Sequence, residues 1–270
     1  MQNAFQENDL PEREPETEEY LLDQPASRSV ERGAAWVYEA FLLLREYWAA
    51  WAVIAAVLYV GEVVGLWLVT YTAGIGAAVY AMFMLFKAGG IAMAASAQEY
   101  EERPPRISDL FMIFDNKIFD FVFLLFLMAV FAGIWALLLF AIASTLLPGL
   151  TASPIAFALL LAFWLVSVQM LLGFAPILLF LQDENPPNAI LSSIKTTAAN
   201  ILPIMLNGLI FVVITMPLML LSAKLDGIAS LVITAMLLAV NILSYLSTYA
   251  AYRDIWFEEG VRDEVTVGYR

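Results

Sequence analysis

Long apolar runs separated by short polar segments dominate the sequence. Crossing about 30 Å of hydrocarbon as a helix takes about 20 apolar residues. The runs lack the period-two alternation of a transmembrane β-barrel. The pattern therefore predicts an all-α, polytopic membrane protein with six transmembrane helices, at residues 48–71, 76–97, 120–147, 154–181, 201–221 and 228–251.

Three further segments are amphipathic or partly polar. In residues 30–48 apolar positions recur at helical spacing between charged ones, which predicts an amphipathic helix along the cytoplasmic leaflet, with Trp36 and Trp48 as anchors. Residues 186–200 begin with two prolines, which suit a helix start, and are expected to lie flat at the interface. Residues 108–119 are a weaker candidate for a third short interfacial helix, with Ser108 as its N-cap.

Positive charge decides the predicted orientation. Short turns join the spans in pairs, and eleven of the 13 Lys and Arg residues lie on the opposite side, with the termini. Only Lys224 lies at a short turn. Because Lys and Arg resist translocation, we expect both termini in the cytoplasm.

Composition excludes much of the familiar chemistry. The 270 residues are 62% hydrophobic and include neither Cys nor His. Disulfides, thiolate nucleophiles, imidazole bases and the common metal ligands are therefore excluded. We expect no cofactor and no metal site, and the net charge of −13 argues against nucleic acid as a partner.

The two ends of the chain are predicted to lie outside the transmembrane domain, which we place at residues 28–257. Residues 1–27 are acidic and poor in apolar side chains, which predicts a disordered cytoplasmic tail, or alternatively an arm that docks a basic partner. The first 23 residues lack the basic and apolar regions of a signal peptide, so we expect no cleavage there. Residues 258–270 are predicted to form a C-terminal cytoplasmic tail.

Ionisable and amide side chains within the spans each need a partner. Counted from the first turn, Glu62 and Lys87 differ in depth by three residues, about 4.5 Å along the helix axis, which predicts an intramembrane ion pair. Gln169 and Asn241 fall at a similar depth, and Asn207 flanks them, which predicts a mid-membrane polar layer. This layer is either a path for protons or substrate or a set of structural hydrogen bonds. We favour the second reading, because a single acid without His is a thin basis for a transporter.

Two other groups of residues are predicted to shape the molecule and its surface. Gly173, Pro176 and Pro217 are expected to kink their helices, since proline removes an amide donor and clashes with the preceding turn. A second group is expected at the cytoplasmic boundary, contacting lipid or a partner, with Asp254 paired to Arg253 or to Arg45: Trp36, Arg45, Tyr252, Arg253 and Asp254.

Several short segments carry a family resemblance, namely residues 33–36, 87–90, 108–111, 174–176, 200–203 and 249–256. With these segments the chain resembles the BPSS1780-like family of uncharacterised bacterial six-span integral membrane proteins. The resemblance covers most of the chain and implies a bacterial inner membrane. It implies no activity.

These observations favour a non-enzymatic membrane protein that acts by association with lipid or with another membrane protein, including a second copy of itself. The alternative is a secondary transporter or channel that uses Glu62 and Lys87. An intramembrane enzyme ranks third, because Glu62 and Asp120 have no partner carboxylate or nucleophile at a chemical spacing.

Overall fold

The computed structural model describes residues 17–72, 74–115, 117–146 and 153–261. In this part of the chain, six helical segments are long and apolar enough to cross a membrane. They are α2 (Trp48–Thr72), α3 (Gly74–Tyr100), α4 (Ile118–Leu146), the segment formed by α6 (Pro154–Leu172) and α7 (Ala175–Leu181), α9 (Ile201–Ser222) and α10 (Gly227–Trp256). The remaining elements are α1 (Arg32–Glu46), a 3-10 helix η1 (Ile107–Asp115), α8 (Pro186–Ala199) and two short strands, β1 (Thr17–Leu21) and β2 (Phe257–Val261).

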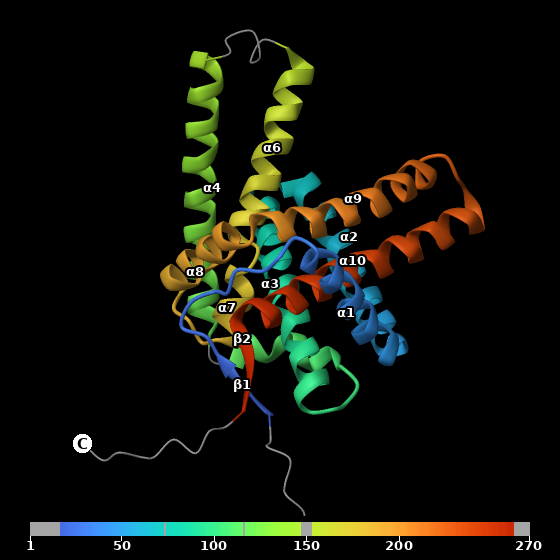
Figure 1. The fold of residues 1–270 in the computed structure, drawn as a ribbon. Coiled ribbons are helices and arrows are strands. Elements are labelled where there is room, and N and C mark those ends of the chain that lie inside the picture. Colours follow the sequence, from blue (N-terminus) through green and yellow to red (C-terminus); the bar gives the residue numbers. More distant parts are fainter. Residues whose placement is uncertain (1–16, 73, 116, 147–152, 262–270) are drawn as a thin grey trace, which may run out of the picture.

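The long helices form three hairpins that share one packed end. The hairpins are α2–α3, α4–α6 and α9–α10. In Figure 1 the α4–α6 and α9–α10 hairpins diverge from each other. We call the shared end the base: it consists of α1, η1, α7, α8 and the ends of α3 and α10 that pack on them. Most of the buried core lies here, including Trp36, Ile91, Leu110, Leu178 and Ile255.

Helix α1 packs into the base against α9 and α10. Gly33 makes this close approach possible, because a Cβ atom there would lie 2.2 Å from the carbonyl oxygen of Pro203 in α9. On helix α1, Trp36 and Ala40 are fully buried, whereas Tyr38 and Phe41 are exposed.

The fourth predicted span is broken rather than merely kinked. Helix α6 ends at Leu172, Gly173 and Phe174 form a turn, and α7 begins at Ala175 with Pro176 in its first turn. Proline is tolerated there because the amides of a first helical turn have no intrahelical partner. At the other predicted kink, α9 continues as a helix through Pro217.

The prediction that residues 1–27 are disordered is wrong for its described part, and residues 1–16 lie outside the described residues. Strand β1 pairs antiparallel with β2, which also orders the first residues of the predicted C-terminal tail. Beyond β1 the chain continues along the base: Leu22 N–H donates to Trp256 O at 2.9 Å and Ala26 N–H donates to Ile255 O at 2.9 Å. We call residues 17–28 the strap. Its ordering depends on a partner from the other end of the chain, which local composition does not reveal.

Candidate functional site

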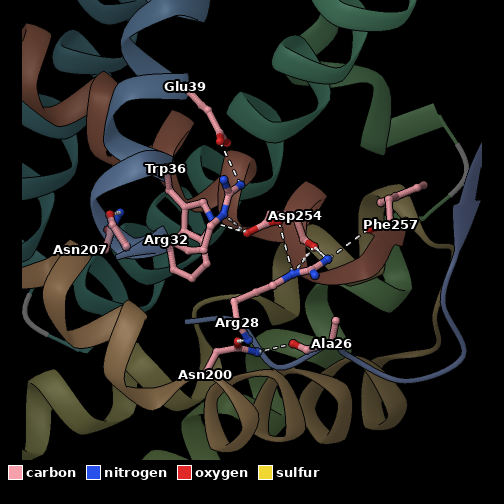
Figure 2. Close-up of polar contacts among 10 residues, drawn as sticks. Ala26, Arg28, Arg32, Trp36, Glu39, Asn200, Asn207, Asp254 and Phe257 are labelled. Carbon is pink, nitrogen blue, oxygen red and sulfur yellow. Dashed lines mark hydrogen bonds and ion pairs between the residues drawn. The ribbon is translucent and has the colours of Figure 1, made fainter. Parts of the chain in front are cut away.

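Asp254, near the end of α10, connects three parts of the base. Its carboxylate accepts hydrogen bonds from Trp36 Nε1 and Arg32 Nε, both at 2.8 Å (Figure 2). Arg28 Nε, from the strap, lies 3.3 Å from the same carboxylate and also donates to the Asp254 carbonyl oxygen at 2.9 Å. One carboxylate therefore holds α1, α10 and the strap together.

The charged side chains around Asp254 shift the pKa values of Arg32 and Glu39. The hydrogen bond to Asp254 raises the pKa of Arg32 above its usual value. Glu39 lies 3.0 Å from Arg32, yet burial raises the pKa of its carboxyl, an effect that Arg32 opposes. As the pH falls, Glu39 therefore takes up a proton before an ordinary exposed glutamate does.

Arg253 joins the other side of the base. Its guanidinium pairs with Glu19 of β1 and Glu99 of α3, and it lies 5.0 Å from the centre of the Tyr100 ring. Tyr252, which directly precedes Arg253, is buried. Both residues therefore hold the base together through contacts with protein.

The predicted group of boundary contacts does not form a lipid-facing surface. Trp36, Tyr252, Arg253 and Asp254 contact protein within the base, whereas Arg45 is exposed on α1. Asp254 pairs with Arg28 and Arg32, not with Arg45 or Arg253 as predicted. The sequence placed these residues at the correct end of the helices, but amphipathic pattern alone does not show which of them a neighbouring helix covers.

A cavity of about 600 Å³ lies among these charged side chains. Its lining includes Arg28, Arg32 and Arg253, whose acidic partners also line it. Ion pairs across the cavity hold the strap against α10, and the lining keeps an acidic excess of six carboxylates against three arginines. In the described part of the chain no group of three or more acidic side chains is placed to hold a metal ion.

The structure brings Glu62 and Lys87 together. Lys87 is 1% exposed, and its Nζ donates to Glu62 of α2 and to Asn241 of α10 and lies 4.9 Å from the centre of the Tyr245 ring. Lys87 is thus enclosed, whereas the Glu62 side chain is 21% exposed. The cluster fastens α10 to the first hairpin.

Helix α8 stabilises the break between α6 and α7. Ser193 Oγ donates to the Leu171 carbonyl at 2.7 Å and accepts from Phe174 N–H at 3.2 Å. Thr197 Oγ1 donates to the Met170 carbonyl. Backbone groups released by a helix break must be satisfied in a membrane, so these two hydroxyls make the break a fixed feature.

A second, larger cavity of about 900 Å³ lies between α6 and α9, and we call it the α6–α9 groove. Trp36 and Ala251 of the base also line it. Its walls are mainly apolar, and several of the lining side chains are exposed, among them Leu165, Val166, Met205, Leu209 and Val212. The groove is therefore open along the faces of two membrane-spanning helices.

Two residues of the predicted polar layer line this groove and not the Lys87 cluster. Asn207 Nδ2 donates to the Gly33 carbonyl at 3.2 Å and to Ser247 Oγ, so it fastens α9 to α1 and α10. Gln169 is exposed in the groove. Gln169 lies three residues before the end of α6, and α7, which completes the predicted span to residue 181, belongs to the base. Gln169 thus lies close to the base, and the single layer resolves into two separate sites.

The sequence reading missed Asn200, which fastens the strap. Its Oδ1 accepts from Arg28 N–H at 2.8 Å, and its Nδ2 donates to the Ala26 carbonyl at 2.8 Å (Figure 2). Asn200 is fully buried between α8 and α9. The signal available in the sequence was the amide side chain of Asn200 at the start of an apolar span.

Comparison of the chain with models of protein families, with curated proteins and with solved structures finds no match.

Proposed function

We propose that this protein is a non-enzymatic, multi-pass inner-membrane protein that associates with lipid, and that an acyl chain occupies the α6–α9 groove. The observation that supports this proposal is the groove itself, which has a volume of about 900 Å³, is mainly apolar, and is open on the faces of α6 and α9. This volume lies within the range of ligand-binding cavities. A groove between membrane-spanning helices is in contact with lipid tails, which match its chemistry.

The distribution of charge supports an orientation with both termini in the cytoplasm, which places the base on the cytoplasmic side. We also propose membership of the BPSS1780-like family on the resembling segments. The transporter alternative gains no support from the Glu62–Lys87 pair, because the two side chains are engaged with each other and Lys87 is 1% exposed.

Glycine positions provide a matched test of the groove. Gly208 in α9 lines it, Gly133 in α4 does not, and a Cβ atom at either position has no neighbour within 4 Å. We therefore expect Gly208→Leu to fold and to fill part of the groove, with Gly133→Leu as the control. The measurement is photocrosslinking in vesicles by a phospholipid with a diazirine on its acyl chain, followed by peptide mapping.

The expected result is labelling concentrated on α6 and α9 that falls several-fold in Gly208→Leu and persists in Gly133→Leu. Equal labelling of all exposed helices would overturn the proposal, because it would reflect ordinary contact with bulk lipid. Crosslinks between two copies of the chain through the groove would show that a second protomer, and not lipid, occupies it.

A further inference from the structure

Gln169 is the polar feature of the α6–α9 groove that the fold does not use. Its neighbours Leu165 and Val166 are exposed apolar residues on the same helix. Among the residues that the structure describes, none forms a hydrogen bond with the Gln169 side chain. An amide that faces an apolar groove gains free energy from a polar partner, and a molecule in the groove can supply one.

The other polar side chains of the groove already have partners. Asn207 donates to the Gly33 carbonyl and to Ser247, and Thr248 Oγ1 donates to the Ser244 carbonyl at 3.1 Å. The side-chain amide of Gln169 supplies two N–H donors. The Gln169 amide is therefore the group of the groove that can donate a hydrogen bond to a polar atom of the bound molecule.

The depth of Gln169 indicates which part of a lipid it meets. Helix α7, the rest of this span, is buried in the base, so α6 is the part of the span that lipid can cover. The 19 residues of α6 rise about 28 Å, close to the thickness of the hydrocarbon core. Gln169 lies three residues before Leu172, the end of α6, which is about 4.5 Å along the axis. This is near the boundary between acyl chains and headgroups, where the ester carbonyls of a glycerolipid lie.

The lack of charged side chains in the described lining limits which lipid headgroups the groove can recognise. No Asp, Glu, Lys or Arg belongs to the described lining of the groove. Recognition of a charged headgroup would need such residues. The groove therefore presents an apolar surface for a chain and one amide for a neutral acceptor.

On the basis of the proposed function, we infer that the groove selects ester-linked glycerolipids, with the Gln169 amide donating to an ester carbonyl while the acyl chain lies along α6 and α9. Ether-linked lipids of the same shape lack this carbonyl and bind more weakly. The headgroup has little influence.

The experiment is a competition in which the diazirine lipid is displaced from the full-length protein in detergent micelles. The competitors are a diester phosphatidylcholine and a diether phosphatidylcholine with the same chain length. We expect the diester to compete about fivefold better, which corresponds to about 1 kcal/mol, the worth of one hydrogen bond. Replacing choline by glycerol in the diester headgroup should change competition less than twofold.

Gln169→Leu keeps the groove apolar and should bind diester and diether equally. The control is Phe163→Leu, which changes an exposed residue of α6 outside the groove and should keep the preference. A wild-type protein that is labelled in the groove but binds both lipids equally would overturn the inference and leave the proposed function standing. A preference that survives in Gln169→Leu would also overturn it. Labelling outside the groove would defeat the proposed function itself.

Discussion

The base and the outer parts of the three hairpins are built from similarly apolar helices, but they meet different surroundings. In α3, which runs into the base, 44% of the most apolar stretch is buried within the protein, whereas in α9 the corresponding share is 0%. The base is held by specific contacts among buried side chains, including ion pairs and hydrogen bonds. The outer parts depend on lipid to cover them, so a change of side chain should matter far less there.

The two aspartates near the ends of α10 provide the largest expected contrast. Asp254→Ala removes the carboxylate that Arg28, Arg32 and Trp36 share, and we expect a loss of about 3 kcal/mol in the free energy of unfolding. This is the lower end of the usual cost, because the two arginines keep some contact with solvent. Asp226 precedes α10 at its other end and makes no side-chain capping bond.

Asp226→Ala should therefore change stability by less than about 0.5 kcal/mol. The measurement is the denaturation of each purified variant in detergent, monitored by tryptophan fluorescence. Equal losses in the two variants would show that the base is not the more specifically held region.

A second contrast compares two glycines in helices. Gly33→Ala places a Cβ atom 2.2 Å from a backbone oxygen of α9, and we expect it to cost about 2 kcal/mol, because neither helix can move without disturbing the base. Gly133→Ala, in open space on α4, should be neutral or stabilising by up to about 1 kcal/mol. Thermal unfolding in the same detergent tests both, and a neutral Gly33→Ala would contradict the close approach of α1 and α9.

The smallest expected effect is a pH dependence that arises in η1. Asp109 is buried, which alone would raise its pKa, but hydrogen bonds from Arg103 Nη1 at 2.8 Å and Arg106 N–H at 2.7 Å lower it below the ordinary value of 3.8. A lowered carboxyl pKa adds stability above pH 3.8 that is lost as the pH falls through the folded-state value.

Asp109→Asn should thus cost about 1 kcal/mol near neutral pH and remove part of the acid sensitivity below pH 4. Unfolding measured from pH 3 to pH 7 compares the variant with the wild type. Parallel curves for the two proteins would show that Asp109 contributes no pH dependence.

The long helices could be predicted from sequence because their signal is local. The fifth span, predicted at residues 201–221, is the helix Ile201–Ser222. The Glu62–Lys87 contact also followed from sequence, since a tight turn between two uninterrupted helices makes counting along the chain a fair measure of depth. Gln169, in contrast, lines the α6–α9 groove and does not reach Lys87, because the chain turns at Gly173 between α6 and α7.

The features that the sequence did not reveal depend on distant partners. Trp36 was expected to anchor α1 at the membrane surface, but Asp254 accepts its N–H within the base. Strand β1 has an acidic, polar composition and becomes ordered only by pairing with β2. The hydroxyls of Ser193 and Thr197 have a role only because the break in the preceding span releases carbonyls beside them.

The antiparallel ladder of β1 and β2 has a consequence for biosynthesis. Strand β1 precedes all the long helices in the chain, and β2 follows them. All the long helices must therefore be synthesised before the ladder can close, and β1 has no β2 to pair with until then. A chain that stops before residue 257 cannot form the ladder, so the strap can close only after the last long helix has been made.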